Sequence, residues 1–220
     1  MSTFPGSPKV LKGGLVVLTP DGSRARRVIS LQYNPDTLTR SYQVQGVGGE
    51  GGGERAQPFR LKGAAIESIK LDAEIDAADQ LEIPGKNPLA PLLGIYPQLA
   101  ALESLVYPSA VQTIANLVLA TVGVMEIVPM QTPLTLFVWG RTRVVPVRIT
   151  ELSITEEAFD PNLNPLRAKV SLGMRVLNQN DLGFLNPGAA LFLVHHLQLE
   201  VLARTLPPGG LSALGLKGLP

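Results

Sequence analysis

The fold is decided by residues 144–177, which read VVPVRITELSITEEAFDPNLNPLRAKVSLGMRVL. Apolar residues take every other position over 166–176, which is the period of a strand with one buried face. The first half alternates in the same way, but its phase slips by one residue near Thr150. Such a slip turns the following side chains to the opposite face, so we expect a β-bulge there. We therefore predict a long antiparallel hairpin in which 144–158 pairs with 166–177.

The loop and the polar face of this hairpin supply the first candidate residues. Asp, Asn and Pro fill the wide connecting loop. Four loop residues are structural or interface candidates: Asp160, Pro161, Asn164 and Pro165. The polar face carries Arg167, Lys169 and Arg175 on the second strand, and Glu151, Glu156 and Glu157 on the first. We expect cross-strand ion pairs there, each worth about 0.2–1 kcal/mol.

Further strands are expected upstream, because Gly and Pro divide the chain into short segments rich in β-branched residues. The turn Pro20-Asp21-Gly22 separates segment 14–19 from segment 28–33. The motif Asn34-Pro35-Asp36 then interrupts the chain before an extended segment, 37–47. We expect this motif to form a tight corner between two strands. Downstream, LTLFVWG at 134–140 begins as a strand covered on both faces.

Segment 59–77 ends in a strand with one polar face. Leu71, Ala73 and Ile75 share its apolar face. The opposite face carries Lys70, Asp72, Glu74 and Asp76. Three carboxylates in a row can bind a cation or line a channel, although such a row is more often the solvated face of a strand. The candidates for a channel or exterior face are Asp72, Glu74, Asp76, Arg167, Lys169 and Arg175.

Three segments have helical spacing. Leu99, Leu102 and Leu105 recur with a helical period, which predicts a short helix packed on the sheet. Residues 110–128 are the most apolar stretch, and we favour a buried helix, or a helix and a strand, over a membrane span, because polar residues interrupt it. A leucine-rich helix is expected over 186–204, capped by Asn186 and Pro187. Its interface candidates are Leu191 and Leu197.

The composition excludes several classes of protein. The 220 residues are 45% hydrophobic and 17% charged, which supports a sizeable core. A net charge of +1 gives no electrostatic case for binding nucleic acid. The lack of cysteine excludes disulfides, thiolate nucleophiles and cysteine metal sites. Residues 1–8 lack the apolar region of a signal peptide, so we expect assembly in the cytoplasm.

No set of residues in the sequence has the pattern of a catalytic site. The two histidines, His195 and His196, are adjacent on a predicted helix, so they point about 100° apart and cannot share a metal ion from that helix alone. The pair His196 and Glu200 has helical spacing, but two such residues are weak evidence for a metal site. Hydrolase and dinucleotide motifs are absent from the sequence. We therefore predict that the protein is not an enzyme and binds no metal or cofactor.

Residues 31–42, LQYNPDTLTRSY, resemble the opening signature of the tube-initiator proteins of contractile injection systems. These proteins are the spike–tube adaptors of phage-tail-like particles. Residues 87–102, 134–140 and 147–177 are similar to the same family. The interface or structural candidates in these stretches include Tyr33, Asn34, Pro35 and Trp139.

The resemblance implies a mainly β, α+β fold: a tail-tube-like antiparallel β-barrel or sandwich with a packed helix and a C-terminal helix. It implies a homo-oligomer, a six-fold ring that joins a trimeric spike to the inner tube, templates tube assembly and contacts baseplate proteins. Relatives often carry a C-terminal LysM domain. The sequence leaves no room for one after the C-terminal helix, so we expect no glycan binding through LysM.

The expected organisation has two parts. Residues 1–185 would form the tail-tube-like domain, with a helical insertion at about 97–128, and residues 186–220 the C-terminal helix and a flexible tail. That helix and tail could dock on the baseplate. Two other functions stay open: a peripheral baseplate or wedge component of the same machine, and a membrane-associated binding protein that uses residues 110–128.

Overall fold

The computed structural model describes residues 11–19, 21–46, 60–121, 132–183, 185–207, 209 and 215. Within these residues, seven strands form one antiparallel sheet in the order β2-β1-β5-β6-β7-β4-β3. The strands are β1 (Gly14–Leu18), β2 (Ala25–Ser30), β3 (Leu38–Gln43), β4 (Ile66–Asp76), β5 (Thr135–Val138), β6 (Val144–Phe159) and β7 (Pro165–Val176). The mainly β class with added helices, expected from the sequence, is confirmed.

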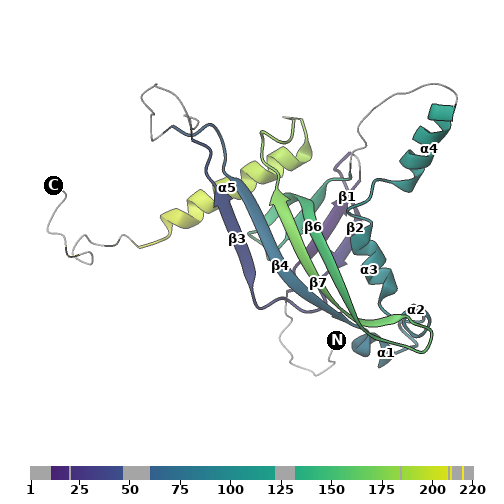
Figure 1. The fold of residues 1–220 in the computed structure, drawn as a ribbon. Coiled ribbons are helices and arrows are strands. Elements are labelled where there is room, and N and C mark those ends of the chain that lie inside the picture. The colour runs from purple at the N-terminus through teal and green to yellow at the C-terminus, as the bar shows by residue number, and fades with distance from the viewer. Residues whose placement is uncertain are drawn as a thin grey trace.

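The sheet is curled, with β3, β4, β7 and β6 in front and β1 and β2 behind (Figure 1). Strands β2 and β3 follow one another in the chain but are the two edge strands. The segment around Asn34 does join two strands, but the predicted tight corner is instead a crossing from one edge of the sheet to the other. The Gln32 amide holds this crossing, because its Nε2 donates to the Asp76 carbonyl and its Oε1 accepts from the Asp76 N–H, both at 2.9 Å.

Strands β6 and β7 form the predicted long hairpin. Their pairing runs from Val147 opposite Val176 to Phe159 opposite Pro165. The register shifts between Ile149 and Glu151, which confirms the predicted β-bulge.

One residue of the hairpin was assigned to the wrong face. Glu156 lies opposite Ala168, which is fully buried, so Glu156 does not belong to the polar face. Beyond the bulge, the apolar face continues through Leu152 and Ile154, and Glu156 is in phase with both.

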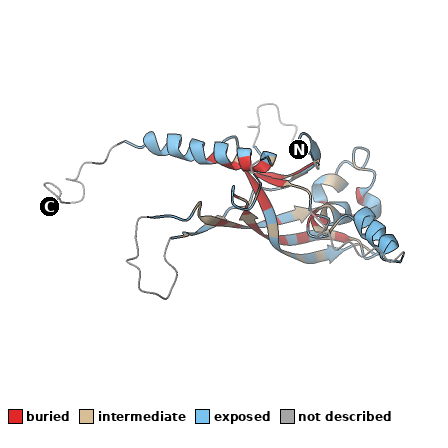
Figure 2. Ribbon diagram, turned by 90° about the horizontal axis from the view of Figure 1, so that it is seen from above, coloured by how far each residue is buried: buried red, intermediate tan, exposed pale blue. Residues whose placement is uncertain are grey.

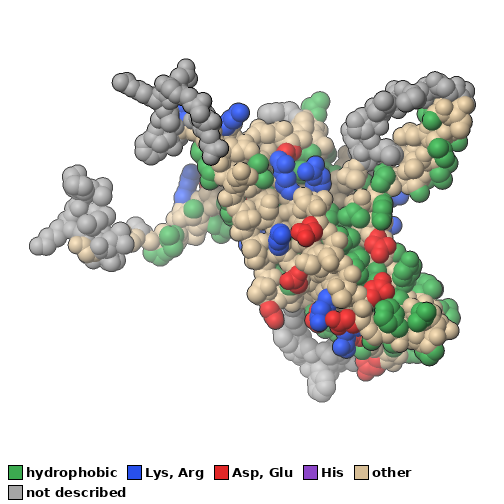
Figure 3. Space-filling model, in the orientation of Figure 1, with side chains coloured by type: hydrophobic (Ala, Val, Ile, Leu, Met, Phe, Trp, Pro, Cys, Tyr) green, Lys and Arg blue, Asp and Glu red, His purple; other side chains and the backbone are tan. Residues whose placement is uncertain are grey.

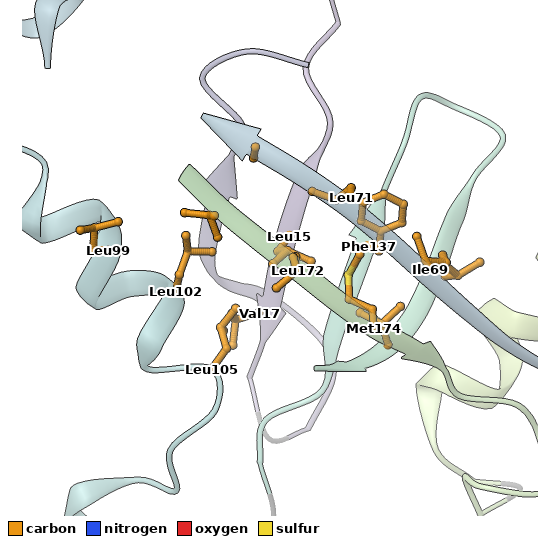
Figure 4. Packing of buried hydrophobic residues seen from close by; sticks show 14 of the residues in the cluster. Leu15, Val17, Ile69, Leu71, Leu99, Leu102, Leu105, Phe137, Leu172 and Met174 are labelled. Atoms are coloured by element: carbon orange, nitrogen blue, oxygen red, sulfur yellow. The ribbon is translucent and has the colours of Figure 1, made fainter. Parts of the chain in front are cut away.

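The core fills the concave side of the sheet. Side chains from the back strands, such as Leu15, meet side chains from the front strands, such as Leu172, and Phe137 of β5 packs beside them (Figure 4). Helix α3 (Tyr96–Glu103) covers one end of the core through Leu99 and Leu102. Full burial of each such side chain stabilises the fold by about 1.5–3 kcal/mol. The predicted helix packed on the sheet is confirmed.

In the described part of the connection between β4 and β5 there are four helices: α1 (Ala78–Leu81), α2 (Ala90–Leu93), α3 and α4 (Ala110–Thr121). Helix α4 projects from the body (Figure 1), and all its residues are exposed (Figure 2). The prediction of a buried helix is therefore wrong for 110–121, and residues 122–128 lie outside the described part of the chain. No helix among the described residues is long and apolar enough to cross a membrane.

The C-terminal helix α5 (Pro187–Arg204) begins as the sequence predicted. The Asn186 side chain accepts a hydrogen bond from the Gly188 N–H at 2.9 Å, and Pro187 occupies the first turn. The start of α5 lies on the body and the remainder projects away from it (Figures 1 and 2). The predicted flexible tail, 211–220, lies outside the described residues except for Gly215.

Candidate assembly surfaces

The outward face of β4 and β7 brings together all six predicted channel-face residues. Asp76 lies opposite Arg167, and Glu74 lies opposite Lys169. Asp72 and Arg175 lie on the same face, each opposite a serine. Because alternate residues of a strand share a face, β6 continues this surface with Ser153, Thr155 and Glu157. Acidic and basic side chains are interspersed over this side of the sheet (Figure 3).

Ion pairs cross the strands on this polar face. Arg167 pairs with Asp76 at 2.7 Å, and Lys169 pairs with Glu157 at 3.0 Å. The Ala78 N–H and, after it, the Arg167 guanidinium hold the pKa of Asp76 below its usual value of 3.8. Exposed pairs contribute little to stability. The polar face is therefore exposed to solvent, and most of its charged side chains lie near a side chain of opposite charge.

A third ion pair spans a strand. Lys70 of β4 reaches Glu151 of β6 at 3.2 Å, across Gly173 of β7. A Cβ atom at Gly173 would lie 3.0 Å from the Cβ of Glu151, so the glycine leaves room for this bridge. The cross-strand pairs predicted within the hairpin are thus confirmed for Glu157, whereas Glu151 pairs with the next strand.

The edge-to-edge crossing borders the polar face. Asn34 fixes the approach to β1, since its Oδ1 accepts from the Gly13 N–H at 2.9 Å and its Nδ2 donates to the Leu11 carbonyl at 2.8 Å. Tyr33 donates from its hydroxyl to the Asp79 carboxylate at 3.3 Å. A cleft of about 490 Å³ separates the crossing from the sheet and is lined by Tyr33, Asn34, Pro35, Asp72, Glu74 and Lys169, among others. The structure therefore joins two candidate groups that the sequence left apart.

The hairpin loop is organised by Asp160. Its Oδ1 accepts from the N–H groups of Asn162 (2.7 Å) and Asn164 (2.8 Å), and its Oδ2 accepts from the Asn164 side chain (2.7 Å). The pKa of Asp160 lies below its usual 3.8, mainly because of the hydrogen bonds from Asn164. Asn164 also donates to the Leu92 carbonyl at 3.0 Å, and the Pro165 carbonyl accepts from the Ile95 N–H at 2.9 Å. Asn164 and Pro165 thus join the hairpin to α2 and α3, while Pro161 is exposed at the tip of the loop.

The remaining candidates have different surroundings. Trp139 stacks on Phe137 with ring centroids 5.8 Å apart, and a Cβ atom at Gly13 would lie 2.4 Å from its ring, so Trp139 is a packing residue. Leu191 is half-buried against the body. Leu197 is 53% exposed on the projecting part of α5. Of these three, Leu197 alone presents a largely free apolar side chain.

Sequence reasoning missed a buried charge and the exposed apolar surface of α4. Glu67 is 6% exposed and pairs with Arg40 at 2.7 Å, while the Tyr42 hydroxyl donates to it at 3.1 Å. The signal was present, because Glu67 is in phase with the buried residues Ile69 and Leu71 of the same strand. That surface, the α4 arm, carries Val111, Ile114, Leu117 and Val118. The predicted apolar helix α5 presents a second exposed surface, the α5 arm, with Leu193, Val194, Leu197 and Val201.

A curled sheet with two edge strands, an interspersed polar face and two projecting apolar arms defines a β-rich assembly subunit. Among the described residues, no three His, Cys, Asp or Glu side chains are grouped so that they could hold a metal ion. The particular family follows from comparison. Residues 18–182 match the family described as contractile injection system tube protein, and the chain belongs to that family.

Comparisons with individual proteins add less. No curated protein matches the sequence. Among solved structures, a chain in "Tail of empty GTA particle computed with helical refinement, C6 symmetry" is 14% identical, with a TM-score of 0.28, and the match covers 74% of this chain and 90% of that one.

Proposed function

We propose that this protein is the baseplate-hub subunit that joins the trimeric spike to the inner tube, as a six-fold ring that templates tube assembly. The observation that carries the proposal is the polar face of β4, β7 and β6, which lies between two open sheet edges. Family membership supports a structural role in a contractile injection system. The resemblance of residues 31–42 to tube initiators supports the position at the spike and the six-fold symmetry.

The open edges supply the contacts of the ring. Among the residues that the structure describes, β2 and β3 each pair with one neighbouring strand, and most of their side chains are exposed. Free edges of this kind invite further strand pairing, which leads to aggregation unless the assembly is closed. A head-to-tail contact between β3 of one copy and β2 of the next would close a ring and remove every free edge.

The polar face suits the lining of a channel. Its ion pairs balance positive and negative side chains, so a passing cargo of either charge meets no strong field. Exposed apolar side chains, which would retain cargo, gather instead on the two arms and along the segment from α1 to α3. In the ring, the α4 and α5 arms would then bury their apolar residues against the spike and baseplate proteins.

The projecting arms also support a second candidate, a peripheral baseplate component of the same machine. Two uncovered apolar helices on opposite parts of the body suit a subunit that bridges several different proteins (Figure 1). In that position the polar face would point to solvent and not to a channel.

Electron cryo-microscopy of particles purified through a tag on this chain tests both. The expected result is one six-fold ring between spike and tube, with Asp72, Glu74 and Lys169 on the channel wall. Density for the chain outside the axis would support the peripheral component and overturn the channel lining.

Because the chain has no cysteine, labelling gives an independent check. Ser171→Cys lies on the polar face, and Ser23→Cys lies in the exposed β1–β2 turn. The Ser171→Cys thiol should react with a bulky maleimide in the free subunit and become protected in the particle, while the Ser23→Cys thiol serves as the control outside the proposed channel. Equal reaction of Ser171→Cys in both states would argue against a channel wall.

A further inference from the structure

Helix α5 is attached to the body by a small set of side chains. Gly188, Ala189, Phe192 and His195 are buried, and Phe192 belongs to the hydrophobic core. Every residue from His196 to Arg204 is exposed. His195 is therefore the last buried residue of α5, and its surroundings bear on how firmly the helix is held on the body.

His195 is buried with one ring nitrogen bonded and the other unpartnered. Its side chain lies 4% exposed, with Nδ1 3.3 Å from the Thr142 carbonyl and Nε2 buried without a hydrogen-bond partner. In the neutral ring, Nδ1–H donates to that carbonyl and Nε2 carries only a lone pair. Protonation would add a charge and a second N–H with no acceptor, in a place that water does not reach.

The charged groups around His195 offer it no free counter-ion. Arg40 faces it from β3, Glu67 from β4, and Arg143 from the β5–β6 connection. Glu67 is already held by Arg40 at 2.7 Å and by the Tyr42 hydroxyl at 3.1 Å. On the helix itself, His196 is exposed and lies 3.9 Å from Glu200, on the solvent side.

We propose that α5 is a releasable arm, which docks on the sheet while His195 is neutral and comes away when the imidazole is protonated. Burial is the main reason that the pKa of His195 lies below its ordinary 6.5. Arg40 and Arg143 lower this pKa further, whereas the Thr142 carbonyl and Glu67 raise it. Release would also uncover Phe192, so acid would extend the apolar surface of the arm toward the core.

The sign of the pH dependence follows from the lowered value. Above the ordinary pKa of 6.5, both the docked and the released ring are neutral and docking does not depend on pH. Below 6.5, the released state binds the proton more readily, so the docking equilibrium constant falls by up to about tenfold per pH unit. The fall stops at the pKa of the docked ring.

The first test is an NMR titration of the full chain carrying His196→Gln, which leaves His195 as the single histidine. The expected result is a midpoint for His195 below 6.5, together with loss of the docked signals of Phe192 at acidic pH. A midpoint at or above 6.5 would overturn the proposal. This measurement keeps the His195 side chain and does not depend on the folding of a variant at that position.

The second test follows the arm directly. Spin labels on Val201→Cys and Ser153→Cys, both exposed positions, report the distance between α5 and the sheet. Between about pH 7.5 and about pH 5, the distance distribution should broaden in the otherwise native chain and in His196→Gln. In His195→Gln, whose amide can still donate to the Thr142 carbonyl but does not titrate, it should stay constant. The same distribution at both pH values in the native chain would show that acid does not release α5.

Discussion

Helices α3 and α4 are neighbours in the chain and are both rich in apolar residues, yet only α3 lies in the core. Leu99 of α3 is 0% exposed, whereas Ile114 and Leu117 of α4 are 61% and 66% exposed. An apolar helix is stable in water when another surface buries its apolar face, but its composition does not say whether that surface belongs to the same chain. Apolar content alone therefore does not determine burial: residues 96–103 pack in the core of their own chain, whereas 110–121 stay exposed in it.

Anchors at both ends explain why α3 stays on the body. At its start, the Ile95 N–H donates to the Pro165 carbonyl at 2.9 Å. Gly94 approaches the same carbonyl so closely, with φ +57°, that a Cβ atom there would lie 2.1 Å from the oxygen. Past its end, the Ser104 hydroxyl accepts from the Arg27 guanidinium of β2 at 2.6 Å. The hairpin and the back of the sheet thus hold α3 over the core from two sides.

The largest effect should come from truncating the buried helix. Leu99→Ala removes a fully buried side chain and leaves a cavity, so we expect the free energy of unfolding to fall by about 2–5 kcal/mol. Urea denaturation of the isolated chain, followed by circular dichroism, measures this change.

The matched control is the same substitution in the exposed helix. Leu117→Ala changes a side chain that is 66% exposed and makes a residue with higher helix propensity, so stability should change by less than about 0.5 kcal/mol. Equal losses in the two variants would mean that α4 is covered by its own chain in solution, and the comparison would fail.

A smaller effect is expected from a change that acts on assembly alone. Ile114→Lys places a charge in the α4 arm and should leave the urea transition of the isolated chain unchanged. Incorporation into particles should fall by about tenfold, as for the loss of one apolar anchor of an interface. Quantitative blotting of purified particles measures the incorporation.

The control for that variant lies on the polar side of the same helix. Gln112→Lys adds the same charge away from Ile114, and its incorporation should stay near that of the native chain. If both variants assemble normally, the apolar face of α4 has no partner in the particle.

Local periodicity is what the sequence could reveal about the fold. The β6–β7 hairpin, its bulge between Ile149 and Glu151 and the polar face of β4 were predictable, because a period of two assigns each residue to a face without knowledge of the neighbours. The Asn186 cap of α5 was predictable for a similar reason, since a cap acts within one turn. The division into 1–185 and 186–220 stays a prediction.

Long-range pairing could not be read in the same way. That β2 and β3 are the two edges depends on which distant strands they join, and nothing around Asn34 encodes this. The six channel-face candidates were found individually, but the bridge from Lys70 to Glu151 needs the order β4-β7-β6 and the gap at Gly173. The exposure of α4 was missed because apolar periodicity is identical for a helix covered by its own chain and one covered by a partner.

The smallest expected effect concerns the anchor of α3. Asp160→Asn keeps the shape of the loop but removes the charge that accepts from Asn162 and Asn164. Hydrogen exchange of the Ile95 amide, whose acceptor is the Pro165 carbonyl next to this loop, should become faster at neutral pH. Because the pKa of Asp160 is lowered in the fold, its contribution is present above the ordinary 3.8 and is lost as the pH falls through the folded value.

The matched control is Asp21→Asn. Asp21 is held by Ser23 and Thr19 with a pKa lowered to about 2, but its turn touches no anchor of α3. Both variants should lose some acid dependence of unfolding, since each removes a carboxylate whose contribution disappears between pH 3.8 and the folded value. Only Asp160→Asn should loosen Ile95. If Asp21→Asn speeds that exchange as much, the amide reports global stability, and the hairpin loop is not what separates α3 from α4.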